Sequence, residues 1–144
     1  MIYLDTSLVV SLYCLDANSV AAANILQTVQ GTRLVTTLCE LETVNVLGLR
    51  VFRKEISSQQ ADISLRNFEK DVRAGVFQLR ALPEPAFDRA RQLSRQLTPK
   101  LGTRTADLLH VAAAFELKAS SLHSFDLQQR KMAQAAGLKL NPWP

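Results

Sequence analysis

The chain has 144 residues, of which 47% are hydrophobic and 21% charged, values typical of one globular domain with a core of its own. No run of 18 apolar residues occurs, which excludes a membrane-spanning helix, and the N-terminus lacks the basic segment of an export signal. The formal net charge of +4 is compatible with a polyanionic partner and equally with a solvated basic surface.

Apolar runs alternate with helical periodicities along the whole chain. In chain order we expect a strand at 2–4, helices at 7–14 and 18–30, a strand at 33–36, helices at 38–54 and 58–74, a strand at 76–79, a helix at 84–97, a loop at 98–102, a helix at 104–118, a strand at 121–123, a helix at 127–136 and a possible strand at 138–140. This alternation predicts an α/β domain over residues 1–144 with a mostly parallel sheet, in which ligands bind beyond the carboxyl ends of the strands.

Four acidic residues lie where predicted strands end or predicted helices begin. Asp5 and Asp126 follow strands, whereas Glu40 and Asp107 lie in the first turns of helices. Two carboxylates ~4 Å apart repel by about 4 kcal/mol at an effective dielectric near 20, so a pocket that gathers them needs a cation. Because hard oxygen ligands suit Mg²⁺ or Mn²⁺, the four acids are candidate ligands of such a metal.

Each acid also has a purely structural explanation. Glu40 completes a capping box with Thr37, and Asp107 and Asp126 are each stabilised near a helix N-terminus by about 0.3–1 kcal/mol. For Glu40 and Asp126, taken singly, the structural explanation is favoured, and for Asp107 the two are balanced. Asp5 favours the functional interpretation, because an unpaired carboxylate directly after an apolar strand is costly.

Glu42 is an alternative to Glu40. Residues two apart on a helix point about 200° away from each other, so only one of these glutamates can face the metal. We choose Glu40 because it is nearer the helix start. His110 is a helical neighbour of Asp107 and would allow an Asp-x-x-His metal pair, but a histidine in so apolar a helix is more often bonded to a neighbouring group.

Four segments, in this order, resemble those of a known family. They are Tyr3-Leu4-Asp5-Thr6-Ser7, Cys39-Glu40-Leu41-Glu42, the segment from Arg104 to Ala112, and Ser124-Phe125-Asp126 followed by a helix and Ala136-Gly137-Leu138. With these segments the chain resembles a PIN domain over essentially its whole length. It is most similar to the small prokaryotic VapC-type toxins of type II toxin–antitoxin systems.

The resemblance implies a Rossmann-like, three-layer α/β/α sandwich with a mostly parallel sheet. It also implies a ribonuclease that depends on Mg²⁺ or Mn²⁺ and hydrolyses RNA phosphodiesters. The catalytic residues and metal ligands would be Asp5, Glu40, Asp107 and Asp126. A homodimer in the cytoplasm, inhibited by a small cognate antitoxin, is the expected assembly. The sequence does not identify which RNA is cleaved.

Other classes with acidic pockets fit less well. A receiver domain needs an aspartate at the end of its middle strand, where this chain has Arg80-Ala81-Leu82-Pro83-Glu84. A haloacid-dehalogenase-type phosphatase needs Asp-x-Asp after the first strand, where this chain has Asp5-Thr6-Ser7. A catalytically silent PIN-fold module that binds protein or RNA partners stays open, and thermal stabilisation by Mg²⁺ or Mn²⁺ would distinguish it from an enzyme.

Overall fold

The computed structural model describes residues 1–142, and its centre is a five-stranded sheet in which all neighbouring strands are parallel. Across the sheet the strand order is β3-β2-β1-β4-β5. The strands are β1 (Ile2–Leu4), β2 (Arg33–Thr36), β3 (Gln78–Arg80), β4 (Ser121–His123) and β5 (Lys139–Leu140). The predicted α/β class with a parallel sheet is therefore confirmed.

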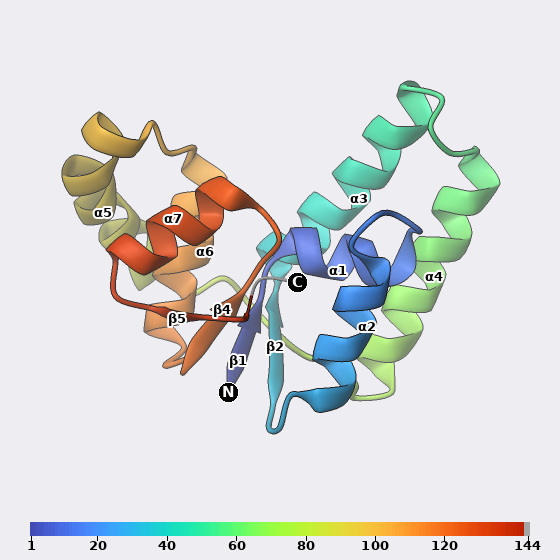
Figure 1. Ribbon diagram of the computed structural model, residues 1–144, viewed down its shortest axis with the longest axis horizontal. Coiled ribbons are helices and arrows are strands. Elements are labelled where there is room, and N and C mark those ends of the chain that lie inside the picture. The colour runs from blue at the N-terminus through green and yellow to red at the C-terminus, as the bar shows by residue number, and fades with distance from the viewer. Residues whose placement is uncertain (143–144) are drawn as a thin grey trace.

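Helices cover both faces of this sheet (Figure 1). They are α1 (Thr6–Tyr13), α2 (Ser19–Thr28), α3 (Thr37–Phe52), α4 (Ser58–Arg73), α5 (Pro85–Leu101), α6 (Thr105–Glu116) and α7 (Leu127–Ala135). Their order agrees with the sequence-based expectation, and their ends differ by a few residues. Among the described residues, no helix combines the length and apolar character needed to cross a membrane.

One predicted loop is wrong, because α5 continues through residues 98–101. Pro99 in this last turn lacks an N–H and so removes one helical hydrogen bond, but it does not end the helix there. The helix ends at Gly102, which adopts the left-handed conformation (φ 62°) and donates its N–H to the carbonyl of Thr98 at 2.9 Å. A glycine just past the last turn is a common helix terminus, because it has no Cβ to clash in this conformation.

The alternation of side chains along β1 creates two separate cores. Tyr3 points to one face, where it joins a cluster that includes Val111 of α6 and Met132 of α7. Ile2 and Leu4 point to the other face, and this cluster is completed by residues of α1, α2, α3 and α4. The sheet is therefore the middle layer of the predicted α/β/α sandwich.

The chain reverses its direction of travel across the sheet at β1. It adds β2 and β3 on one side, then returns and adds β4 and β5 on the other, so β1 has β2 and β4 as neighbours. Leu4 pairs with His123, and the N–H of Asp5 donates to the carbonyl of His123 at 3.1 Å. Such a switch point leaves a crevice beyond the carboxyl ends of the strands. It therefore places Asp5 beside the segment that follows β4.

His123 provides a test of this packing, because it is buried in β4 with 6% of its surface exposed. Burial, and next the positive charge of Arg130, lower the pKa of His123 from 6.5 to about 4. Below pH ~6.5 the unfolded chain binds a proton at His123 that the folded chain refuses until about pH 4. The contribution of the neutral, buried His123 to the free energy of unfolding is thus fully present above pH ~6.5 and is lost as the pH falls. From these pKa values, lowering the pH from 7.5 to 5 reduces the free energy of unfolding by about 2 kcal/mol.

We expect His123→Gln to lose less unfolding free energy than the wild type between pH 7.5 and pH 5, by about this 2 kcal/mol. Urea denaturation at the two pH values measures the difference. All other residues are the same in both proteins, so the difference between them reports on residue 123 alone. Equal acid sensitivity of the two proteins would show that His123 binds its proton as readily in the folded chain as in the unfolded one.

Candidate functional site

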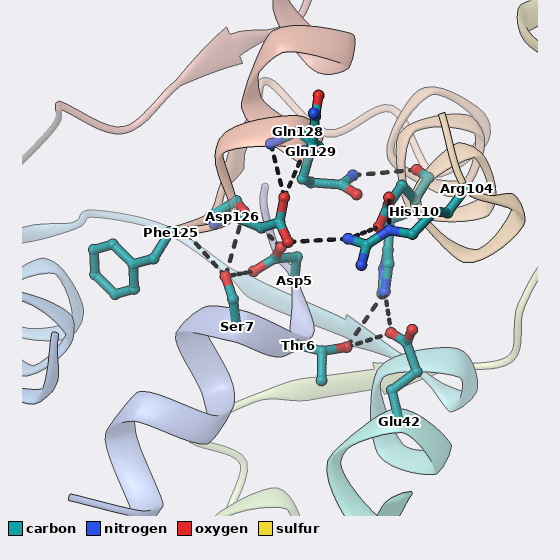
Figure 2. Close-up of polar contacts among 12 residues, drawn as sticks. Asp5, Thr6, Ser7, Glu42, Arg104, His110, Phe125, Asp126, Gln128 and Gln129 are labelled. Atoms are coloured by element: carbon teal, nitrogen blue, oxygen red, sulfur yellow. Dashed lines mark hydrogen bonds and ion pairs between the residues drawn. The ribbon is translucent and has the colours of Figure 1, made fainter. Parts of the chain in front are cut away.

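A pocket opens at the carboxyl end of the sheet, beside the switch point. Three of the four acids chosen from the sequence line it: Asp5, Asp107 and Asp126. Glu42 also lines this pocket, whereas Glu40 does not. The side chains come from four different segments of the chain, and Figure 2 shows those of Asp5, Glu42 and Asp126 facing a common space. The predicted convergence of distant acidic residues is present, with one glutamate exchanged for the other.

Asp5 is the most enclosed of these acids, with 4% of its surface exposed. Its Oδ1 accepts hydrogen bonds from the hydroxyl of Ser7 (2.7 Å) and the backbone N–H of Leu8 (3.2 Å), which makes it the N-cap of α1. Its Oδ2 accepts from the hydroxyl of Ser124 at 2.6 Å. Burial raises the pKa of Asp5, and the charge of His110 and these hydrogen bonds offset only part of that effect.

The residues that follow β4 hold Ser124 in place. The N–H of Ser124 donates to Oδ1 of Asn141 at 2.9 Å, and Arg130 donates to the same oxygen at 2.8 Å. Asn141 follows β5 and is 2% exposed. The orientation of Asp5 therefore depends on contacts that reach to the far end of the described chain. No sequence motif indicated Asn141, because its partners are set only by the folded arrangement.

Glu42 is held by a chain of buried polar groups. Its Oε2 lies 2.5 Å from the hydroxyl of Thr6 and 2.5 Å from Nε2 of His110. On the other side of the ring, Nδ1 of His110 lies 2.8 Å from the hydroxyl of Tyr3, which contacts the hydroxyl of Thr36 at 3.0 Å. His110 is thus bonded to neighbouring side chains, the more ordinary of its two predicted roles.

These contacts decide the charge of Glu42. Burial by itself raises the pKa of this carboxyl, but the hydrogen bonds from His110 and Thr6 and the positive charge of Arg104 outweigh burial and lower it. Glu42 therefore carries its negative charge at neutral pH.

The structure places Glu42 in the pocket and Glu40, the residue chosen from the sequence, outside it, and the packing of α3 gives the reason. The buried face of α3 is the row of Cys39, Thr43 and Leu47, each at most 3% exposed. Residues 42, 46 and 50 form the next row, which lines the pocket. Leu41 and Val44, apolar residues that would be expected on the buried face, are instead 66% and 46% exposed. A helical wheel with Cys39 at the centre of the buried face would have selected Glu42.

Asp107 and Asp126 share one cation, Arg104. Nε and Nη2 of Arg104 donate to the two oxygens of Asp107, at 2.8 and 3.3 Å, and Nη2 also donates to Oδ2 of Asp126 at 3.0 Å. Oδ1 of Asp126 accepts from the backbone N–H groups of Gln128 and Gln129, as the N-cap of α7. Asp107 is the first factor that raises the pKa of Arg104.

The donor atoms of this pocket are of the type that a hard divalent cation prefers. Their present arrangement suits such a cation less well. Four carboxylates line one pocket, and carboxylate oxygen is the donor that Mg²⁺ and Mn²⁺ prefer. Yet within residues 1–142 no three His, Cys, Asp or Glu side chains are arranged to hold a metal ion as they stand. Arg104 supplies a physical reason, because it occupies the oxygens of two of the four carboxylates.

Fold and pocket together define an α/β/α protein with an acidic cavity at the switch point of a parallel sheet. The model of the PIN domain family matches residues 2–135, so the chain belongs to the PIN domain family. The resemblance drawn from the sequence is therefore confirmed at the level of the family. No curated protein matches the chain at a significant level.

Several solved structures share this fold. VapC20 of Mycobacterium tuberculosis, described as a toxin that cleaves the sarcin–ricin loop, is 18% identical with a TM-score of 0.67, covering 96% of each chain. FitAcB from Neisseria gonorrhoeae is 17% identical with a TM-score of 0.72, covering 99% of each chain. VapBC-1 from nontypeable Haemophilus influenzae is 17% identical with a TM-score of 0.68, covering 99% of this chain and 98% of that one. At such identities the likeness is one of fold.

The chain of polar groups behind Glu42 leads to a prediction of stability. Tyr3→Phe removes a fully buried hydroxyl and leaves Thr36 and His110 without this partner, which should cost about 1–3 kcal/mol of unfolding free energy. Tyr13→Phe is the matched control, because its hydroxyl donates to the partly exposed Asp71, which water can then solvate. Urea denaturation of both variants measures the difference. Equal losses would contradict the role assigned to the buried chain.

Proposed function

We propose that this protein is a metal-dependent ribonuclease that hydrolyses RNA phosphodiesters and acts as the toxin of a toxin–antitoxin pair. The observation that carries the proposal is the gathering of Asp5, Glu42, Asp107 and Asp126 around one pocket in a chain of the PIN domain family. Carboxylates from four separate segments would not be brought together for packing alone, because their mutual repulsion opposes folding.

In this proposal the four carboxylates hold Mg²⁺ or Mn²⁺. The ion, when bound, lowers the pKa of a water molecule and neutralises charge that develops on the phosphate. The protein's own part is to fix the donors. Ser7 and Ser124 orient the two oxygens of Asp5, and Thr6 and His110 orient Glu42. Partners that orient a metal ligand in this way typically contribute about 10–100-fold to metal affinity or activity.

Binding of the RNA backbone requires positive charge near the acids. Arg50 and Arg104 line the pocket. Arg50 forms an ion pair with Asp16 at 3.2 Å. We assign Arg50 to backbone phosphate, because a guanidinium makes paired hydrogen bonds with phosphate oxygens.

The identity of the substrate and partners rests on the relatives. VapC20, which shares the fold, is described as a toxin that cleaves the sarcin–ricin loop, and sequence-specific proteins usually recognise RNA in single-stranded loops. We extend a substrate of this kind to the present chain. A small cognate antitoxin, a homodimeric state and a cytoplasmic location complete the proposal, each as the resemblance to VapC-type toxins implies.

One observation favours the alternative of a silent binding module. Arg104 already neutralises Asp107 and Asp126 without any metal, as it would in a pocket whose acids serve only structure. The two functions differ in their response to metal. A working metal centre gains thermal stability from Mg²⁺ or Mn²⁺, because a ligand that binds only the folded state stabilises it, and a silent module does not.

We expect Asp5→Asn to abolish RNA cleavage while the fold is kept, since the change removes the charge of a buried ligand and almost none of its volume. Wild type and variant are incubated with total RNA in Mn²⁺, in EDTA, and in EDTA followed by excess Mn²⁺. Only wild type with free Mn²⁺ should cleave, and circular dichroism should be the same for both proteins. Cleavage by the wild type in EDTA would rule out a metal-dependent reaction.

The pair Glu42→Gln and Glu40→Gln tests the corrected assignment within a single helix. Glu42→Gln should lower the rate of cleavage by about 100-fold or more, because a metal ligand is worth at least as much as its orienting partners. Glu40→Gln should leave the rate within about twofold, since Glu40 lies outside the pocket. Rates are measured on one RNA under single-turnover conditions. The reverse ranking would return the site to the original choice.

A further inference from the structure

Arg104 is anchored to the acidic pocket by its head group and by little else. The side chain is 65% exposed, whereas those of Asp107 and Asp126 are 11% and 34% exposed. It belongs to the residue that precedes α6, where the backbone is extended. Figure 2 shows the guanidinium reaching over the pocket toward Asp126. The group can therefore swing out into solvent without disturbing either core of the sandwich.

The hydrogen bonds of the two aspartates leave little room for a second cation. Both oxygens of Asp107 accept from Arg104. Oδ1 of Asp126 caps α7, and its remaining oxygen, Oδ2, also accepts from Arg104. A divalent ion bound directly by either aspartate would lie next to the guanidinium, and like charges at such a distance repel strongly. Metal and guanidinium thus require the same carboxylate oxygens.

We propose that Arg104 is a built-in counter-ion that occupies the carboxylates of the metal centre, competes with the divalent ion and so sets the metal affinity of the pocket. This inference rests on the proposed function, because it needs a metal to bind at all. It accounts for two observations together: the acids converge in one pocket, yet no three of the described residues are arranged as a ready metal site. The affinity for metal is then weakened by the work of displacing Arg104.

The opposite role for Arg104 makes an opposite prediction. If the arginine served to hold Asp107 and Asp126 in the geometry that a metal needs, its removal would weaken metal binding. If Arg104 competes with the metal, its removal strengthens binding. The sign of the change in affinity therefore decides between the two roles, and no measurement of catalysis is required.

The test is calorimetric titration of the full chain with Mn²⁺. For Arg104→Gln we expect the dissociation constant to fall about tenfold, a difference of about 1.4 kcal/mol. Arg95→Gln is the control, because it removes the same charge from an exposed position of α5 outside the pocket, and its constant should change by less than about twofold. Arg104→Lys, which keeps the charge and loses the planar fork, should lie between Arg104→Gln and wild type.

Melting temperatures provide a second measurement that also detects a poorly folded variant. Without metal, Arg104→Gln should melt below the wild type, because Asp107 and Asp126 lose their shared cation. Saturating Mn²⁺ should close or reverse that difference. An unchanged or weaker affinity in both Arg104→Gln and Arg104→Lys would overturn the inference and leave the metal centre intact. No binding by any of the proteins, wild type included, would overturn the metal centre and this inference with it.

Discussion

Four carboxylates repel one another in the pocket, and the fold compensates each of them with different partners. Asp5 receives hydrogen bonds from two serines and a helix N-terminus, Glu42 from a histidine and a threonine, and Asp107 and Asp126 share a single arginine. Every partner named here is a hydrogen-bond donor or a cation, and such partners offset the repulsion among the carboxylates.

The topology of the sheet is what brings these groups together. With β1 between β2 and β4, the ends of three strands meet at one edge, and the segments that follow them supply Asp5, Thr37 to Glu42, and Ser124 to Asp126. Helix α6, which packs against one face of the sheet, adds Asp107 and His110. A parallel sheet with a switch point places all these segments at the same edge, so residues more than a hundred positions apart become neighbours.

The sequence was sufficient for the order of elements and for three of the four acids. Apolar runs and helical periods report burial directly, and an acid after a buried strand has few ways to be tolerated. The sequence did not reveal which glutamate of α3 faces the pocket, because the buried row of this helix contains Cys39 and Thr43, which are weak markers of burial, while Leu41 and Val44 are exposed. The partners of Arg104 and Asn141 were not predictable, because they depend on how separate elements pack.

The link from Asn141 through Ser124 to Asp5 has a consequence for synthesis of the chain. Asp5 leaves the ribosome before Ser124, Arg130 and Asn141, which are added at least 119 positions later. A nascent polypeptide cannot complete this arrangement while it is still being translated up to that point. The hydrogen bonds that orient Asp5 therefore form only after nearly all of the described chain has been synthesised.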